Sequence, residues 1–351
     1  MENEELYIPI ENLEVESRIE LGNASIYPSS HVQSIINRLS IITEKTKNTQ
    51  GEKIKIIDWQ EKDLKLHLGK YAFIGIISKI SKGDNLIPKD LTSIYEQIKD
   101  VIAVLYLLQK QIAGISSIEN QKFGLKNELN RSLNFIIALQ GNERSSYSLH
   151  WKGILGNWTF ANREINKFTT NPIYCYFNSL LKKQIKNDIE QRILSSIVWL
   201  YDAVMDFSPI NRFVKIAISL EVLFTSGKDK KSFRLSRFST LLSHLFIHND
   251  LKCLCPILDT HTHKEYITKV KKLNLPGICS AYWNIRKWYS IRSNIVHDAQ
   301  RTVDKKELNS FEWWAHKLIV SVINLVAIEK ITNIDDLEIF LERKYRASIK
   351  K

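Results

Sequence analysis

Residues Trp288 to Asp298 read WYSIRSNIVHD, which brings a cation, a titratable imidazole and small polar side chains into one strongly patterned apolar stretch. In a helix, residues four positions apart lie on the same ridge. Tyr289, Ser293 and His297 have this spacing, and Arg292 lies on the neighbouring ridge. The pattern therefore predicts a helix on which Arg292 and His297 border one cleft.

These two side chains suit phosphodiester chemistry that needs no metal. An imidazole titrates near neutral pH and can move a proton, whereas a guanidinium is permanently charged and can hold two phosphate oxygens. In RNA the 2'-hydroxyl is an internal nucleophile, so His297 would act as general base or acid while Arg292 stabilises the phosphorane charge. An arginine and a histidine at this spacing also occur by chance, so the spacing alone is weak evidence.

Three segments of the C-terminal half carry a resemblance to a known family. The motif from Arg292 to His297, near the end of an aromatic-rich helix, is similar to the arginine–histidine signature of the HEPN superfamily of helical RNA-binding and RNA-cleaving domains. Two earlier segments follow the order found in Apea-like HEPN domains of bacterial defence proteins: Arg192 with Trp199, Tyr201 and Ala203, and then Ile218–Phe224. The likeness covers about residues 180–330.

The resemblance implies a bundle of four or five helices that forms a homodimer, with the motifs of the two subunits facing each other. It implies that Arg292 and His297 are catalytic and cut RNA without a metal, leaving a 2',3'-cyclic phosphate and a 5'-hydroxyl. Ser293 or Asn294 would position the phosphate or orient the imidazole. Ser293 directly after the arginine and Asp298 directly after the histidine depart from many active relatives. Asp298 could hold one tautomer of His297 or repel phosphate.

Other charged residues can support this site. Glu221 lies inside an apolar stripe, where an unpaired carboxylate is costly. It would orient an arginine of the site, either Arg292 or Arg286, or it would form an ordinary buried ion pair, which is the interpretation we favour. The candidates for contacts with the RNA backbone are Arg286, Lys287, Arg234 and Arg237, each of which could equally be a solvated surface charge.

Composition sets the broad class of the protein. A chain of 351 residues suggests about two domains and a sizeable core. A net charge of +12 favours attraction to polyanions but does not by itself indicate nucleic-acid binding. The chain opens with the acidic segment MENEE and contains no run of roughly 18 apolar residues. We therefore expect a cytoplasmic protein that does not bind membranes.

The cysteines are few and scattered, which is typical of reduced thiols and not of a disulfide framework. The segment 247–264 contains possible zinc ligands, namely His248, Cys253, Cys255, His261 and His263. Their spacing matches no standard zinc finger, and ligands one residue apart converge poorly. We expect neither a metal nor a cofactor.

The N-terminal half has mixed character. Alternating apolar residues predict short strands within residues 5–28, at Lys53–Trp59 and at Tyr71–Ile80, and an apolar stripe predicts a helix from Lys89 to Ile112. Gly124 to Leu139 could be helical, and Gly141 to Tyr147 is loop-like. We expect an α+β sensor or docking domain over residues 1–150, followed by an aromatic-rich irregular linker over residues 151–179.

The C-terminal half is predicted to be helical throughout. Apolar stripes predict helices over Asp188–Met205, Pro209–Thr225, Ser232–Phe246 and Ser280–Val296, followed by a long helix that Asp304 and Glu307 open as a capping box. Residues 180–335 would form the HEPN helical domain. Residues 336–351 would add a short helix and a basic tail, which is either solvated or adds nonspecific phosphate affinity.

The sequence thus favours a mostly α protein that acts as a homodimeric, metal-independent endoribonuclease. It would cleave tRNA or another structured RNA with an unpaired loop, in anti-phage defence or a toxin-like stress response, under the control of the N-terminal domain or of a regulatory partner protein. One alternative is a catalytically silent HEPN module that binds RNA, nucleotide or a partner protein. Another is a toxin that a cognate nucleotidyltransferase neutralises.

Overall fold

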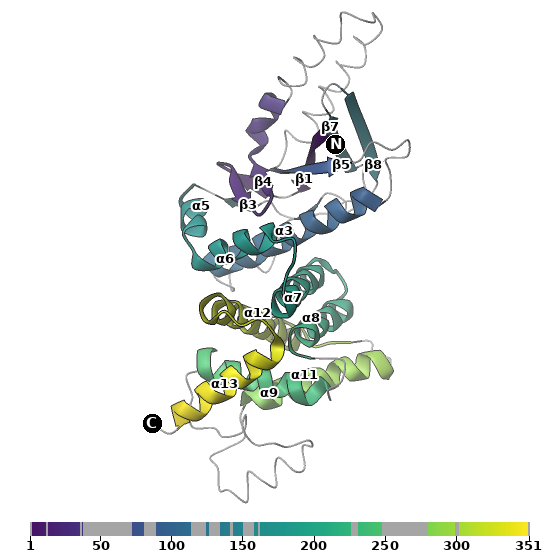
Figure 1. Ribbon diagram of the computed structural model, residues 1–351. Helices are drawn as coiled ribbons and strands as arrows, with labels where there is room; N and C mark the ends of the chain where they lie inside the picture. The colour runs from purple at the N-terminus through teal and green to yellow at the C-terminus, as the bar shows by residue number, and fades with distance from the viewer. Residues whose placement is uncertain are drawn as a thin grey trace, which may run out of the picture. The chain divides into compact units, whose positions relative to one another are not determined.

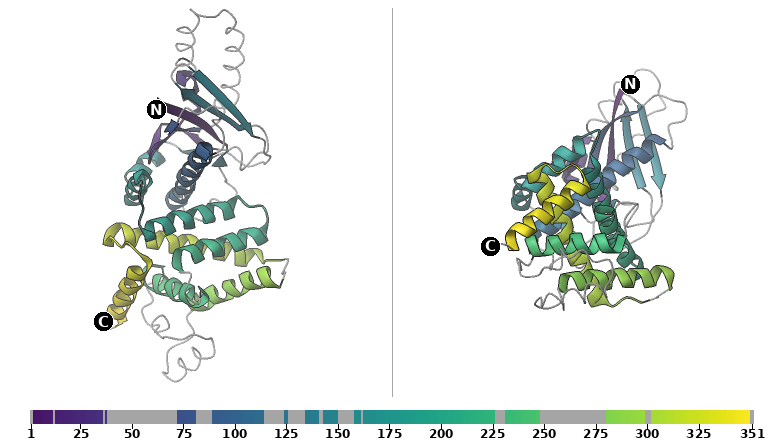
Figure 2. Two further views of the ribbon diagram at one scale, coloured as in Figure 1. Left: turned by 45° about the vertical axis from the view of Figure 1, so that its right-hand side comes forward. Right: turned by 60° about the horizontal axis from the view of Figure 1, so that its bottom comes forward.

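A computed structural model describes residues 2–11, 13–35, 37, 72–80, 89–113, 124–125, 134–140, 143–149, 158–160, 162–225, 231–247, 280–298 and 302–349. The protein is mostly helical, with a small sheet in its N-terminal part, as the sequence predicts (Figure 1). The chain divides into two compact units, Met1–Lys183 and Gln184–Lys351. In Figure 2 the strands belong to the purple-to-teal N-terminal unit, and the described elements of the green-to-yellow part are helices.

The first unit is built on an antiparallel sheet with the strand order β3-β4-β5-β1-β7-β8, and β6 pairs with one end of β1. Its strands are β1 (Glu2–Glu11), β3 (Ile19–Leu21), β4 (Ala24–Tyr27), β5 (Phe73–Ile80), β6 (Gly124–Leu125), β7 (Asn134–Gln140) and β8 (Glu143–Leu149). Two further strands, β2 (Leu13–Val15) and β9 (Trp158–Phe160), pair in parallel. The sheet therefore pairs the first strand of the chain with strands that follow much later in the sequence.

The hairpin of β3 and β4 shows how the sequence gives this sheet. Ile19 and Ile26 are fully buried and directly opposite each other, whereas Glu20 on the other face of β3 is exposed. This alternation follows from the two-residue period of a strand. Gly22 forms the turn with φ +65°, a conformation that glycine adopts without steric cost.

Helices pack against the sheet within the first unit. α3 (Lys89–Ala113) contacts β5 and β6 and also α5 (Asn162–Thr169) and α6 (Pro172–Lys182), and every residue of α3 from Val101 to Lys110 is buried. α6 starts at Asn171, whose side chain accepts a hydrogen bond from the Ile173 N–H, with proline at the first helical position. The apolar face of α3 and the sheet thus form the hydrophobic core of the first unit.

Several predictions for this unit need correction. The helix expected over Gly124–Leu139 is wrong, because β6 and β7 lie there, and most of the loop expected at Gly141–Tyr147 belongs to β8. Short apolar runs are compatible with either a helix or a strand. Here the backbone hydrogen bonds of β7 to β1 and to β8 stabilise the strand. The irregular linker expected over residues 151–179 instead contributes β9, α5 and most of α6 to the first unit. The strand predicted at Lys53–Trp59 lies outside the described residues.

The second unit is a helical bundle in which α7 packs against α8 and α12 contacts α7, α8 and α9. Its described helices are α7 (Asp188–Met205), α8 (Pro209–Phe224), α9 (Lys231–Leu242), which continues as the π-helical turn η3 (Ser243–Ile247), α11 (Ser280–His297), α12 (Lys305–Glu329) and α13 (Ile334–Ile349). The helix bounds predicted from the apolar stripes agree with these. The expected basic tail is not a separate segment, since Arg343 to Ile349 belong to α13.

Caps explain why these helices begin where they do. Asn187 and Glu190 form a reciprocal capping box at the start of α7, and the Ser208 side chain accepts a hydrogen bond from the Asn211 N–H at the start of α8. Asp304 caps α12 by accepting from the N–H groups of Lys306 and Glu307. Such caps contribute about 1 kcal/mol each, which is enough to fix a helix start in a bundle of this size.

α12 is the longest described helix of the second unit. It is long and apolar enough to cross a membrane by length and composition, but 72% of its apolar window is buried inside the protein. A mostly buried helix in the core of a globular domain passes the same test. The remainder of the described chain contains no second helix that passes this test.

Candidate functional site

The candidate site begins with an ion pair between α8 and α11. The Nε and Nη2 atoms of Arg292 lie 3.3 Å from Oε1 and 3.5 Å from Oε2 of Glu221. The Arg292 side chain is 20% exposed and the Glu221 side chain 10%. Of the two arginines considered for Glu221, Arg292 is therefore the one that it contacts. The pair is long for a charge-assisted hydrogen bond, so Glu221 orients the guanidinium without using all of its donors.

Tyr289 lies one turn before Arg292 on α11. The Arg292 guanidinium carbon is 5.9 Å from the centre of the Tyr289 ring, which is within the range of a cation–π contact. Burial raises the pKa of Tyr289 above its ordinary value, the negative charge of Glu221 raises it further, and the positive charge of Arg292 partly offsets this. Glu221, Tyr289 and Arg292 thus form one electrostatically coupled cluster.

The C-terminal half of α11 becomes progressively exposed towards His297. Trp288 is buried, Ser293 is half-buried, and Asn294, His297 and Asp298 are exposed. The Asp298 N–H donates to the Asn294 carbonyl at 2.9 Å, which continues the helical pattern one residue past His297. Helix α11 therefore carries both a partly buried arginine and a solvent-accessible histidine near its C-terminal end.

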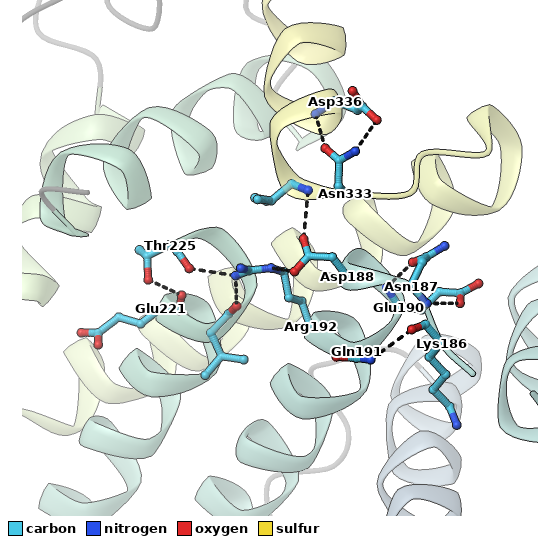
Figure 3. Close-up of polar contacts among 12 residues, drawn as sticks. Lys186, Asn187, Asp188, Glu190, Gln191, Arg192, Glu221, Thr225, Asn333 and Asp336 are labelled. Carbon is cyan, nitrogen blue, oxygen red and sulfur yellow. Dashed lines mark hydrogen bonds and ion pairs between the residues drawn. The ribbon is translucent and has the colours of Figure 1, made fainter. Parts of the chain in front are cut away.

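A second arginine fixes the end of the helix that carries Glu221. The Arg192 Nη1 donates to the carbonyls of Val222 and Thr225 at 3.0 and 2.8 Å, and its Nε donates to Asp188 at 2.8 Å (Figure 3). Asp188 in turn accepts a hydrogen bond from the Ile334 N–H at the start of α13. A cation at a helix C-terminus satisfies its last carbonyls and complements the helix dipole.

The role of Arg192 was missed by sequence reasoning, which used this residue only as part of the resemblance. The i, i+4 spacing of Asp188 and Arg192 is a readable signal for the ion pair, but the carbonyls that Arg192 binds are 30 and 33 residues further along the chain. Only the packing of α7 on α8 brings them together.

Trp288 and Glu307 connect α11 to α12. The Trp288 indole N–H donates to one carboxylate oxygen of Glu307 at 3.0 Å, and the Lys287 ammonium binds the other at 2.6 Å. Glu307 was expected to complete a capping box with Asp304. The Asp304 side chain does cap α12, but the Glu307 side chain contacts α11 and fixes the helix that bears Arg292.

The basic residues considered for RNA contacts do not share one environment. Arg237 forms ion pairs with Glu338 and Glu342 of α13, and Lys287 is paired with Glu307. Arg286 is half-buried on α11, and the Arg234 side chain lies outside the described part of the structure. The charges of Arg237 and Lys287 are thus matched within the bundle, which argues against a main role in phosphate binding.

Across the described ranges, no group of three or more His, Cys, Asp and Glu side chains is placed to hold a metal ion. Cys175 on α6 is an exposed free thiol. The histidines and cysteines between residues 248 and 263 lie outside the described ranges.

No protein-family model matches this chain, and neither the curated proteins nor the solved structures include a match to it.

Proposed function

We propose that this protein is a metal-independent endoribonuclease of the HEPN type. The observation that carries the proposal is that α11 bears a guanidinium oriented by Glu221 and an exposed imidazole near the same helix end. Ser293 and Asn294 lie between them in the sequence. The scissile phosphodiester would bind at this end of α11, held by Arg292 and within reach of His297 from one of two subunits.

The proposed reaction is an internal transesterification of RNA. His297 takes the proton of the 2'-hydroxyl as its oxygen attacks phosphorus, and the bond to the 5'-oxygen breaks. Arg292 stabilises the negative charge on the phosphorane oxygens. The products are a 2',3'-cyclic phosphate and a 5'-hydroxyl, and a proton returns to the leaving oxygen.

Two subunits would form the working site. Ile291 and Ile295 are half-buried in this part of α11, and Val296, next to His297, is 49% exposed. Apolar side chains left open beside charged ones are typical of protein interfaces. A two-fold contact along this surface would bring two copies of the motif together and exclude water from the phosphate.

The proposed substrate is tRNA or another structured RNA with an unpaired loop, because sequence-selective cleavage requires splayed bases and a flexible 2'-hydroxyl. The proposed setting is anti-phage defence or a toxin-like stress response in the cytoplasm. The first unit would then restrain or trigger cleavage.

The test is cleavage of total tRNA by the purified full chain in the presence of EDTA. We expect Arg292→Ala and His297→Ala each to lower the cleavage rate by about 100-fold or more while RNA binding remains. Ser290→Ala, an exposed change on the same helix, should cleave normally. A 2'-deoxy substitution at the cut site should abolish the reaction. Equal cleavage by the wild type and both variants would reveal a contaminating nuclease and remove the proposal.

The dimer is tested separately by sedimentation. Val296→Asp should convert the dimer to a monomer and abolish cleavage, because a carboxylate would be buried in the apolar contact. Ile328→Asp, at a side chain that is 74% exposed on α12, is the matched control and should leave both unchanged. A wild-type chain that is monomeric at the concentrations where it cleaves RNA would contradict the composite site.

One observation favours a second candidate, a silent module that binds RNA, nucleotide or a partner protein. Arg292 already has a carboxylate partner in Glu221, which is also what a purely structural ion pair requires. This candidate predicts RNA or partner binding without cleavage under any condition of the assay above.

A further inference from the structure

A cavity of about 450 Å³ lies on the sheet of the first unit and is no part of the site on α11. Three aromatic rings line it, from Tyr7 on β1, Tyr27 on β4 and His31 in the short 3-10 helix η1 (Ser29–His31). Charged and polar groups complete the lining, chiefly Arg18, Glu20 and Ser25. Its volume lies within the usual range for small-molecule sites.

The register of the strands explains why these residues meet. Glu20 lies opposite Ser25, Ser25 lies opposite Gly75 of β5, and Gly75 lies opposite Tyr7 on its other side. Residues in register point to the same face of a sheet. One face therefore carries a row of polar and aromatic side chains around a glycine, while Ile19, Ile26 and Ile74 belong to the apolar core.

Gly75 allows two rings to pack closely on the sheet at the wall of the cavity. A Cβ at this position would lie 2.8 Å from Cε2 of Tyr27 and 3.0 Å from Cε1 of Tyr7, so these rings occupy the space that a side chain at residue 75 would need. Tyr27 is further held by Phe73, with ring centres 5.4 Å apart, and by stacking on His31 at 4.6 Å. The aromatic wall is thus packed in place before any ligand arrives.

The polar rim is a closed network of three residues. Arg18 pairs with one carboxylate oxygen of Glu20, its Nη2 donates to the Ser25 hydroxyl at 2.9 Å, and that hydroxyl donates to the other carboxylate oxygen of Glu20 at 2.9 Å. The guanidinium lies 5.0 Å from the centre of the Tyr27 ring. Arg18 and Glu20 are each about half exposed, at 53% and 54%, so their remaining donors and lone pairs face solvent.

Helix α6 makes two hydrogen bonds to the hairpin of β3 and β4. The Tyr174 hydroxyl donates to the Glu20 carbonyl, and the Gly22 N–H donates to Oδ1 of Asn178 at 2.9 Å. A Cβ at Gly22 would lie 2.6 Å from Cβ of Leu181, so the turn and the helix are in close contact. The backbone that presents Glu20 is therefore fixed at both of these points, as a preorganised site requires.

We propose that this cavity binds a guanine base, either of a free nucleotide or of an unpaired residue in RNA. A carboxylate can accept both adjacent N–H groups of guanine, at N1 and N2, while a guanidinium donates to its O6 and N7 acceptors. Glu20 and Arg18 present such an acceptor and such donors side by side. The half-buried His31 ring lines the same cavity, and aromatic rings are groups on which unpaired bases stack.

The same chemistry discriminates against other bases. Adenine offers one donor beside a lone pair at its N1, which would face the carboxylate of Glu20. Hypoxanthine keeps the O6 and N1–H of guanine but lacks the N2 amine, so it would lose one of the two hydrogen bonds to Glu20. Inosine monophosphate is therefore the sharpest probe, since it differs from guanosine monophosphate only by that amine.

The first experiment is calorimetric titration of the wild-type full chain with guanosine, inosine and adenosine monophosphates up to millimolar concentration. We expect guanosine monophosphate to bind about tenfold or more tightly than either of the others, the difference that one to two lost hydrogen bonds produces. No binding of guanosine monophosphate, or equal binding of all three, would overturn the proposal without any variant being made.

The second experiment locates the site. Glu20→Gln keeps the shape of the side chain but replaces one acceptor oxygen by an amide NH2 donor that would face a guanine N–H, so the preference for guanosine over inosine monophosphate should disappear. Glu16→Gln is the matched control, because Glu16 is exposed in the same unit but does not line the cavity. An unchanged preference in Glu20→Gln would place the guanine site elsewhere and refute the assignment.

A third arm separates the two sources of guanine. Short RNA hairpins with one guanine unpaired in the loop, or the same guanine paired in the stem, are titrated into the His297→Ala variant so that cleavage does not interfere. Tighter binding of the unpaired form than of guanosine monophosphate identifies an RNA residue, and equal binding identifies a free nucleotide. The inference does not rest on the ribonuclease proposal, and either can fail alone.

Discussion

Replacing Glu221 by glutamine tests the contact on which the candidate site is built. The change keeps the size of the side chain and removes its charge, so the 20% exposed Arg292 guanidinium loses the negative charge of Glu221. Breaking a well-formed buried pair costs several kcal/mol. Because the two distances here are 3.3 and 3.5 Å and Arg292 retains some solvent contact, we expect a loss of about 1–2 kcal/mol in the free energy of unfolding of the second unit.

Circular dichroism and spectroscopic titration measure the two consequences. A loss of this size should lower the thermal midpoint of the second unit by roughly 3–6 °C. The same change should lower the pKa of Tyr289 towards its ordinary value, because the Coulombic part of its rise comes from Glu221. The pKa is read from the phenolate absorbance as the difference between each protein and its Tyr289→Phe derivative.

The matched control is Glu329→Gln, an exposed charge change at the end of α12. It should alter neither the midpoint nor the Tyr289 titration. If Glu221→Gln unfolds within about 0.5 kcal/mol of the wild type and leaves the Tyr289 pKa unchanged, the pair is not formed in solution, and the argument that Glu221 orients Arg292 fails.

Three further predictions concern other contacts. Arg192→Ala should destabilise the second unit by about 2–3 kcal/mol in denaturant unfolding, because two C-terminal carbonyls of α8 lose a charged donor. Arg192→Lys should recover less than half of this loss, because lysine lacks the planar guanidinium that presents several N–H donors at once. The pKa of Tyr289 is raised in the folded protein, so its contribution to stability is complete below its ordinary pKa of 10.0 and is lost as pH rises through the folded value. The free energy of unfolding should therefore fall less steeply at alkaline pH in Tyr289→Phe than in the wild type. Gly22→Ala should destabilise the first unit by about 2–4 kcal/mol, because φ is +65° and the new Cβ meets Leu181, whereas Asn23→Ala in the same turn should cost much less in the same melting experiment.

The helices of the second unit were predictable because each carries its own local signal. Ser208 followed by Pro209 marks the start of α8, and Asp304 marks the start of α12, in both cases through hydrogen bonds that span only two or three residues. The apolar stripes between such caps have a period that no strand can match. In the first unit the same method failed at β7 and β8, where pairing between strands outweighs local preference.

The candidate site was also predictable only in part. The sequence placed Arg292 and His297 on one helix and named Glu221 as a partner for an arginine, but it could not choose between Arg292 and Arg286. Glu221 and Arg292 are 71 residues apart, and their contact depends on how α8 packs on α11. The cavity on the sheet was missed altogether, although the alternation of Arg18 and Glu20 with buried isoleucine and leucine is a readable sign of a polar sheet face.

The sequence by itself determined where the C-terminal helices begin and end, that the N-terminal part is mixed, and which side chains could carry chemistry. These properties depend on hydrogen bonds and periodicities within a few residues of each other. The tertiary structure alone decided that Glu221 faces Arg292, that Arg192 closes the end of α8, and that strand register gathers Tyr7, Glu20 and Gly75 around one hollow. Such contacts join residues distant in the chain, so their energies appear only when the core has packed and fixed the position of each backbone segment.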